Sequence, residues 1–375
     1  MNLPEKLTFF LVAGEASGDL HGANLIKELK RQHPQAEFIG HGGNKMAHEG
    51  LEIMEHIRKL SIMGFVEVIR HLPYFHKVMK STFEKIRKLK PHRIILIDYP
   101  GFNLRLAKKC RSLGIPITYF ILPQLWAWKE GRINIFKECI DQSLCIFPFE
   151  QEWFESRGVA ANYVGHPFSD FSKINLNSAD FFKKHGLEKD QPLLTFLPGS
   201  RQQEINLHWP IFLETAAILK KHIPKLAFVL GRAKEVIFPS IPDFIIQEEN
   251  ARCAMVSGTA ALTASGTASL ECAVLDTPEV VCYKMNYFSG LLAKKLNRAP
   301  FAAMVNLIAQ RKVVPEFLQG DMTAPNLAEA LLPLLAPTLE RKTMLTGFNE
   351  VRRTLGLPGV YERAGQAILN RTLHG

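Results

Sequence analysis

Short apolar runs alternate with amphipathic helical stretches along most of the chain. The first run extends from Leu7 to Ala13, ends at Gly14, and precedes a helical pattern of apolar residues from Leu20 to Leu29. Similar runs occur at residues 93–97, 117–121, 143–147, 193–197 and 226–230. A continuous apolar run of this length is typical of a strand buried on both faces of a parallel sheet. The alternation therefore predicts an α/β fold.

The second half repeats this pattern after a polar interval. Residues 170–190 lack a clear strand, so we place the connection between two domains there. Residues 279–284 predict another strand, residues 316–319 the start of a helix, and residues 324–372 a helical tail. A chain of 375 residues is long enough for two domains. We expect a first Rossmann-like lobe over residues 1–170 and a second over 171–375, which includes the tail.

The composition is that of an ordinary globular protein, with 47% hydrophobic and 22% charged residues. No apolar stretch approaches the ~20 residues that span a bilayer, and the first run is better explained as a buried strand than as a signal peptide. The six cysteines have no Cys-x-x-Cys or metal-type spacing, which predicts reduced thiols in a cytoplasmic protein. The net charge of +10 favours contact with polyanions.

Much of this positive charge lies between Ile57 and Lys90, where nine Lys and Arg residues face only two Glu residues. The apolar residues at the end of this segment recur at three- and four-residue steps, which predicts an amphipathic helix. Such a helix either lies on an anionic membrane or packs on the protein core with its basic face in solvent. No nucleic-acid-reading motif is present, so nucleic acid is not expected. The membrane interpretation assigns contacts to Met63, Phe65, Val66, Ile69, Leu72, Phe75 and Met79.

Two strand–helix junctions in the second half have the chemistry of phosphate sites. At the start of a helix, unpaired N–H groups and the helix dipole favour an anion. Glycine allows close approach, hydroxyls donate hydrogen bonds, and Arg201 offers a planar cationic fork. The predicted contacts are Gly199, Ser200, Arg201 and Glu204 at the first junction, and Ser265, Gly266, Thr267 and Ala268 at the second. A simple tight turn is the alternative for the second junction.

Three acidic residues complete the candidates. Glu271, one turn into the second helix, is placed to accept hydrogen bonds from a ribose. Asp98 ends the run 93–97, and Glu15 follows the first run, near Asp19. Ligands of open α/β sheets bind beyond the carboxyl ends of the strands, so these acids point to a ligand. Asp98 is our first candidate for a general base and Glu15 the second, although an Asp at this position can also cap a turn.

A series of motifs spread in order over most of the chain carries a family resemblance. The motifs are Gly14-Glu15-Ala16-Ser17-Gly18-Asp19, Met63-Gly64-Phe65-Val66-Glu67-Val68, Ile97-Asp98, Trp126-Ala127-Trp128, Phe147-Pro148-Phe149-Glu150, Gly165-His166, Leu197-Pro198-Gly199-Ser200-Arg201 and Ala264-Ser265-Gly266-Thr267-Ala268 with Glu271. Together they resemble the lipid-A-disaccharide synthase family of bacterial glycosyltransferases. The resemblance adds Tyr283 and Asn306 to the UDP-binding residues. Leu122, Gln124 and Val305 depart from its pattern.

The resemblance implies the two-lobed GT-B architecture with the active site in the cleft between the lobes. It implies inverting transfer from UDP-2,3-diacylglucosamine to 2,3-diacylglucosamine 1-phosphate (lipid X), without a metal ion or other cofactor. It also implies a homodimer bound peripherally to the cytoplasmic side of the inner membrane. Two alternatives are a UDP-sugar 2-epimerase-like enzyme, which needs no lipid surface, and a non-catalytic lipid-binding protein of the same fold.

Overall fold

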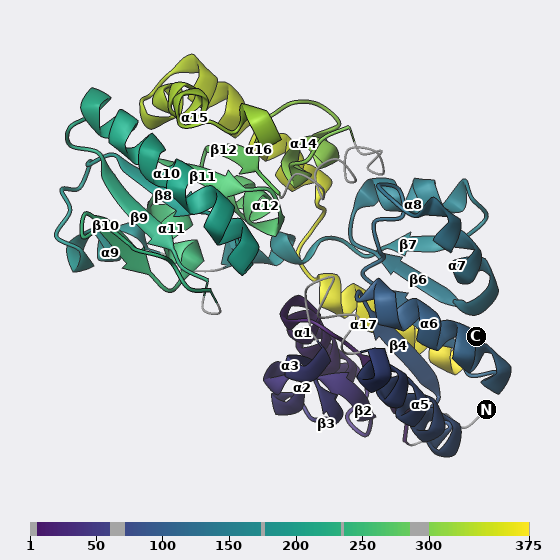
Figure 1. Ribbon diagram of the computed structural model, residues 1–375. Coiled ribbons are helices and arrows are strands. Elements are labelled where there is room, and N and C mark those ends of the chain that lie inside the picture. Colours follow the sequence, from purple (N-terminus) through teal and green to yellow (C-terminus); the bar gives the residue numbers. More distant parts are fainter. Residues whose placement is uncertain (1–5, 61–71, 174–176, 234–235, 286–299, 375) are drawn as a thin grey trace. The chain divides into compact units, whose positions relative to one another are not determined.

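The computed structural model describes residues 6–60, 72–173, 177–233, 236–285 and 300–374 (Figure 1). The chain forms two compact units, one of residues 1–167 and 357–375 and the other of residues 168–356. Each unit contains a parallel sheet with helices between its strands. In the described segments, no helix combines the length and the apolar character needed to cross a bilayer.

The described strands of the first unit form a seven-stranded parallel sheet in the order β3-β2-β1-β4-β5-β6-β7. Its strands are β1 (Thr8–Val12), β2 (Glu37–Gly42), β3 (Leu51–His56), β4 (Arg93–Ile97), β5 (Ile117–Phe120), β6 (Gln142–Cys145) and β7 (Ala161–Tyr163). Its helices are α1 (Ala16–Gln32), α2 (Asn44–His48), α3 (Ile57–Leu60), α5 (Leu72–Leu89), α6 (Pro100–Cys110), α7 (Ile133–Cys139), α8 (Pro148–Glu155) and α17 (Val360–His374). The apolar runs that predicted its strands are buried, as a two-sided sheet requires.

The second unit has a six-stranded parallel sheet in the order β10-β9-β8-β11-β12-β13. Its strands are β8 (Leu193–Leu197), β9 (Ala227–Gly231), β10 (Ile245–Glu248), β11 (Ala260–Ala264), β12 (Glu279–Tyr283) and β13 (Glu316–Leu318). Its helices are α9 (Ser178–Lys184), α10 (Gln202–His222), α11 (Ala251–Ser257), α12 (Thr267–Val274), α14 (Met304–Ala309), α15 (Ala324–Leu331) and α16 (Leu339–Thr354). The two described sheets confirm the predicted α/β class.

The prediction of a helix start at Glu316 is wrong, because this residue begins the edge strand β13. Val281 to Tyr283 of β12 pair in parallel with Glu316 to Leu318. The buried side chain of Asn306 fixes the residues that precede this strand. Its amide oxygen accepts hydrogen bonds from the N–H groups of Val313 and Val314. Pairing with a distant strand thus determines the local conformation.

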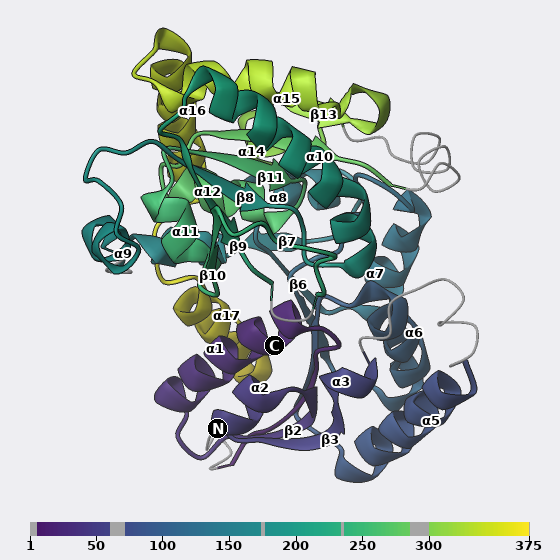
Figure 2. The same cartoon turned by 60° about the vertical axis from the view of Figure 1, so that its left-hand side comes forward.

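The apolar face of α5 packs on the core of the first unit. Val78, Met79 and Ile86 are buried in a cluster with β1, β4 and α6, and Phe75 packs against the same cluster. Helices α5 and α6 lie side by side in both views (Figures 1 and 2). For Met79 the structure therefore replaces the predicted membrane contact with a core contact, while Phe75 is half-buried and Lys77, Lys80, Arg87 and Lys88 on the opposite face are exposed.

The last helix, α17, belongs to the first unit, whereas the predicted second lobe included the whole tail. It packs against α1 (Figure 1). Its Ile368 is fully buried. Arg93, buried in β4, donates hydrogen bonds to Thr372 Oγ1 at 2.8 Å and to the carbonyl oxygen of Arg371 at 2.8 Å. These contacts bring the end of the chain back to the first sheet.

Truncation of this helix contact should destabilise the first unit. We expect Ile368→Ala to lower the free energy of unfolding by about 2–5 kcal/mol, because it leaves a cavity under α17. Denaturant unfolding measures the loss, with Asn370→Ala on the exposed face of the same helix as the control. Equal stability of the two variants would contradict the packing of α17.

Candidate active site

The order of the strands places the predicted loops at two equivalent points. In the first sheet the order reverses between the neighbours β1 and β4, which are followed by Gly14-Glu15 and by Asp98. In the second sheet it reverses between β8 and β11, which are followed by Pro198–Arg201 and by Ser265-Gly266. At such a reversal the adjoining helices leave toward opposite faces, which opens a crevice beyond the strand ends. Each pair of loops therefore lies at a ligand-binding position of the fold.

The backbone after β4 is held in an unusual conformation. Asp98 and Tyr99 both have left-handed φ angles, 46° and 49°, a region that non-glycine residues rarely adopt. The side-chain amide of Asn103 donates to the carbonyl oxygen of Asp98 at 2.7 Å, and the hydroxyl of Tyr119 donates to the same oxygen at 2.6 Å. These two bonds keep the turn in place and so determine where the Asp98 carboxyl lies.

The loop after β1 is fitted to this turn. The ring of Tyr99 occupies the space that a β-carbon at position 14 would need, so only glycine fits there. The Tyr99 hydroxyl donates to the carbonyl oxygen of Leu60 at 2.8 Å, which holds the ring against the loop. Glu15 is the residue after Gly14; its backbone is extended, and α1 begins directly after it.

Asp98 is an unusually weak acid for a carboxyl group. Its pKa is raised to about 6, first by burial and then by the negative charge of Glu15, while a hydrogen bond from the Tyr99 backbone opposes the change. A carboxyl that titrates near neutral pH is suited to accept a proton from a substrate hydroxyl. The structure thus brings the two predicted acids, Asp98 and Glu15, into electrostatic contact.

Asp19 has a structural role instead of the ligand role that its position suggested. Its side chain is 4% exposed and accepts hydrogen bonds from the backbone N–H groups of Gly43 at 2.7 Å, Met46 at 3.1 Å and Lys45 at 3.2 Å. These groups lie at the start of α2, where helical N–H groups lack partners. Asp19 therefore caps α2.

At the first junction of the second unit, Glu204 organises the loop. Its carboxylate accepts hydrogen bonds from the backbone N–H groups of Ser200 at 3.0 Å and Arg201 at 3.2 Å, and from the Tyr283 hydroxyl at 3.0 Å. Its Oε1 also lies 3.4 Å from Arg201 Nη1. Glu204 thus orients Arg201 and occupies backbone donors that were predicted to bind phosphate. The side chain of Arg201 remains 59% exposed.

At the second junction, the start of α12 is open. Gly266 precedes the helix without a side-chain cap, and Gly266 and Thr267 are exposed, with Ala268 half-buried behind them. Apart from its two chain neighbours, no described residue comes within 4 Å of a β-carbon built on Gly266. The hydroxyl of Ser265 donates to the carbonyl oxygen of Ala302 at 2.8 Å, so it fixes the loop. The open helix start is the stronger anion-binding feature of this junction.

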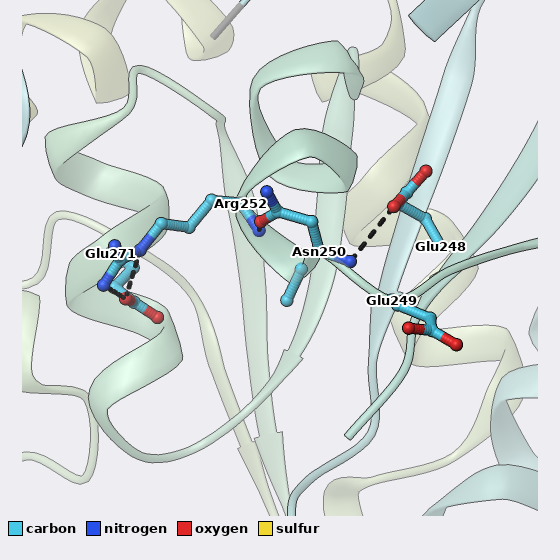
Figure 3. Close-up of a pocket in the computed structure, with 6 residues that line it drawn as sticks. Glu248, Glu249, Asn250, Arg252 and Glu271 are labelled. Atoms are coloured by element: carbon cyan, nitrogen blue, oxygen red, sulfur yellow. Dashed lines mark hydrogen bonds and ion pairs between the residues drawn. The ribbon is translucent and has the colours of Figure 1, made fainter. Parts of the chain in front are cut away.

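Glu271 lines a pocket of about 500 Å³ beside α12, together with residues 248–252 (Figure 3). The guanidinium of Arg252 donates to Glu271 Oε1 through Nε at 3.1 Å and Nη2 at 3.0 Å. Burial raises the pKa of Glu271, and the charge of Arg252 opposes this effect. Sequence reasoning missed Arg252, because the short strand β10 before it was not predicted. The sequence did contain the N-cap residue of the helix that carries Arg252: the side chain of Asn250 accepts a hydrogen bond from the Arg252 N–H at the start of α11.

Asn306 has a structural role instead of the predicted contact with UDP. Asn306 is 0% exposed, and its amide also donates to the carbonyl oxygen of Val314 and to Glu316 Oε1, so all its hydrogen-bonding groups serve the protein and none is left for UDP. Leu72 is the first residue of α5. Met63, Phe65, Val66 and Ile69 lie outside the described residues.

Comparison with known proteins identifies the family. A model of the lipid-A-disaccharide synthetase family matches residues 9–369. The chain belongs to this family. It is 37% identical over 367 residues to the lipid-A-disaccharide synthase of Myxococcus xanthus, with 96% of each chain covered. It is 38% identical over 363 residues to that of Solibacter usitatus, with 95% of each covered.

Solved structures show the fold alone. The UDP-GlcNAc 2-epimerase of Neisseria meningitidis, bound to UDP-GlcNAc, has a TM-score of 0.60 and 11% identity, and the alignment covers 99% of this chain and 100% of the epimerase. The glycotransferase of kitacinnamycin has a TM-score of 0.60 and 12% identity, with 99% of each chain covered. The match to the lipid-A-disaccharide synthetase family confirms the predicted resemblance. It favours an enzyme of lipid A synthesis over the epimerase alternative, which shares only the architecture.

The raised pKa of Asp98 predicts how stability depends on pH. The folded protein holds this proton more tightly than the unfolded chain, so ionisation of Asp98 weakens the fold as pH rises from about 4 through 6. We expect Asp98→Asn to raise the free energy of unfolding by roughly 1–3 kcal/mol at pH 8, a gain that disappears toward pH 4. Denaturant unfolding at several pH values measures it, and Glu152→Gln, exposed on α8, is the control. A pH-independent difference would show that Asp98 has an ordinary pKa.

Proposed function

We propose that this chain transfers the diacylglucosamine unit of UDP-2,3-diacylglucosamine to the 6-hydroxyl of lipid X, with inversion. The products are the β-1,6-linked disaccharide 1-phosphate and UDP. The observation that carries the proposal is the match to the lipid-A-disaccharide synthetase family over residues 9–369, and the Asp98 carboxyl at the reversal point of the first sheet, whose pKa is raised to about 6, supplies a candidate base.

Asp98 acts as the general base in this proposal. Its carboxylate accepts the proton of the acceptor hydroxyl while the hydroxyl oxygen forms a bond to C1 of the donor sugar. The C1–oxygen bond to the diphosphate breaks at the same carbon, and the electron pair leaves with UDP. Glu15 keeps the pKa of Asp98 raised and is the second candidate for the base. A positioned base contributes about 10²–10⁴ in rate.

The second unit binds the donor. The diphosphate lies between the side chain of Arg201 and the open start of α12 at Gly266 and Thr267, and the ribose hydroxyls donate to Glu271. Because UDP gains negative charge as it leaves, cationic and N–H groups aimed at the diphosphate stabilise the transition state more than the ground state. We propose that this stabilisation needs no metal ion or other cofactor.

The substrates carry acyl chains, so we propose that the enzyme works peripherally at the cytoplasmic face of the inner membrane and as a homodimer. The exposed basic face of α5, with Lys77, Lys80, Arg87 and Lys88, supplies charge of the sign that anionic lipid headgroups attract. The apolar contacts predicted for residues 63–72 stay predictions.

A direct assay tests the function. The purified protein receives both diacylated sugars, and UDP release and disaccharide formation are measured together. We expect equimolar UDP and disaccharide only when both sugars are present. Epimerisation of a UDP-sugar without an acceptor, or lipid binding without UDP release, would instead support one of the two alternative functions.

Two variants separate the proposed roles in the same assay. Asp98→Asn should lower kcat by about 10²–10⁴ with unchanged UDP affinity, because it removes only the base. Arg201→Gln should weaken UDP binding about tenfold, because it removes a charge-assisted phosphate contact. Lys221→Gln, exposed at the far end of α10, is the matched control for charge. Near-normal turnover of Asp98→Asn would exclude Asp98 as the base.

A further inference from the structure

A group of cationic side chains surrounds an exposed tryptophan on the first unit. Trp128, in the loop after β5, is 45% exposed. Lys129 Nζ lies 4.4 Å from the centroid of its ring and the guanidinium carbon of Arg132 lies 6.0 Å from it. Arg105, exposed on α6, lies close enough for its charge to act on Lys129. We call Arg105, Trp128, Lys129 and Arg132 the Trp128 cluster.

The cluster holds like charges close together. The pKa of Lys129 is lowered first by burial and then by the positive charges of Arg132 and Arg105. The neighbouring acid Glu130 forms an ion pair with Arg157 at 2.8 Å. The guanidinium of Arg157 lies 4.0 Å from the centroid of the Trp153 ring. Folding therefore assembles cations whose mutual repulsion an anionic ligand would relieve.

The Trp128 cluster is built on the same packing as the candidate base. Helix α7 begins directly after Arg132, and its Phe136 ring lies 5.2 Å from the ring of Tyr119. The hydroxyl of Tyr119 donates to the carbonyl oxygen of Asp98. The charges of both Asp98 and Arg132 act on this hydroxyl. The cluster and the turn that holds Asp98 are thus connected through Phe136 and Tyr119.

We propose that Arg105, Lys129 and Arg132 bind the 1-phosphate of the acceptor sugar, with the Trp128 ring against the apolar part of the same molecule. The proposal rests on the proposed function. Arginine forks match phosphate oxygens in pairs, and lysine adds a point charge. A phosphate monoester carries about −1.5 to −2 charges near pH 7, which suits three cations better than the single charge of a phosphodiester headgroup. The ligand is therefore the acceptor and not a bilayer lipid.

Acceptor kinetics in neutral detergent test the assignment. Arg132→Gln and Arg105→Gln should each raise the KM for lipid X about tenfold, with kcat and the donor KM unchanged. Lys137→Gln on α7 and Lys108→Gln on α6 remove an exposed charge from the same helices and should leave the lipid X KM unchanged. Arg132→Lys keeps the charge but loses the fork, so its KM should lie between those of the wild type and Arg132→Gln.

A second acceptor isolates the phosphate. With 2,3-diacylglucosamine that lacks the 1-phosphate, the wild type and Arg132→Gln should have equal kcat/KM, because the contact is absent from both. A tenfold difference that persists with this acceptor would overturn the proposal. Thermal melting shows whether each variant is folded. If Arg132→Gln does not fold, the KM of Arg132→Lys for lipid X tests the phosphate contact instead.

A vesicle experiment distinguishes the source of the phosphate. Arg132→Gln should sediment with phosphatidylglycerol vesicles as the wild type does. Reduced sedimentation with an unchanged lipid X KM would assign the cluster to a lipid headgroup and overturn the proposal. Failure of the proposed function has a different signature, since the wild type itself would then form no disaccharide.

Discussion

The reversal of strand order in each parallel sheet is the constraint on which the candidate site depends. Because β1 and β4 are neighbours, and β8 and β11 are neighbours, their following helices leave toward opposite faces. The loops between strand and helix are then left uncovered at the carboxyl ends. Glu15 and Asp98 occupy this position in the first unit, and Arg201 and Gly266 occupy it in the second.

Within the first unit, the position of Asp98 is determined by the turn that follows β4. Two successive left-handed residues cost of order 1–3 kcal/mol each, so the surroundings must hold them. Asn103 and Tyr119 do so through the Asp98 carbonyl, and the ring of Tyr99 fills the space left by Gly14. The burial that follows from this packing, with Glu15 beside it, also raises the pKa of the carboxyl. The packing around this turn therefore determines both the position of the Asp98 carboxyl and, together with Glu15, its raised pKa.

The sequence predicted the features that depend on local pattern. Apolar runs located β1, β4, β8 and β12, and the candidate loops that follow β1, β4, β8 and β11 lie at the two reversal points. It could not predict β13, a three-residue strand whose conformation depends on pairing with β12. Nor could it assign α17 to the first unit, because the buried contacts of Arg93 join residues far apart in the chain. Polar residues such as Asp19 and Asn306 look like ligand contacts in a motif, and only the fold shows that they serve the backbone.

The acidity of Asp98 gives the most direct test of this account. Selective ¹³C labelling of aspartate allows its carboxyl to be titrated by NMR, with Asp98→Asn used to assign the resonance. We predict a midpoint near pH 6 that moves to lower pH in Glu15→Gln, because the repulsion from a neighbouring carboxylate is then lost. A midpoint near the ordinary aspartate value of about 3.9, unaffected by Glu15→Gln, would contradict the role of Asp98 as a base prepared by the fold.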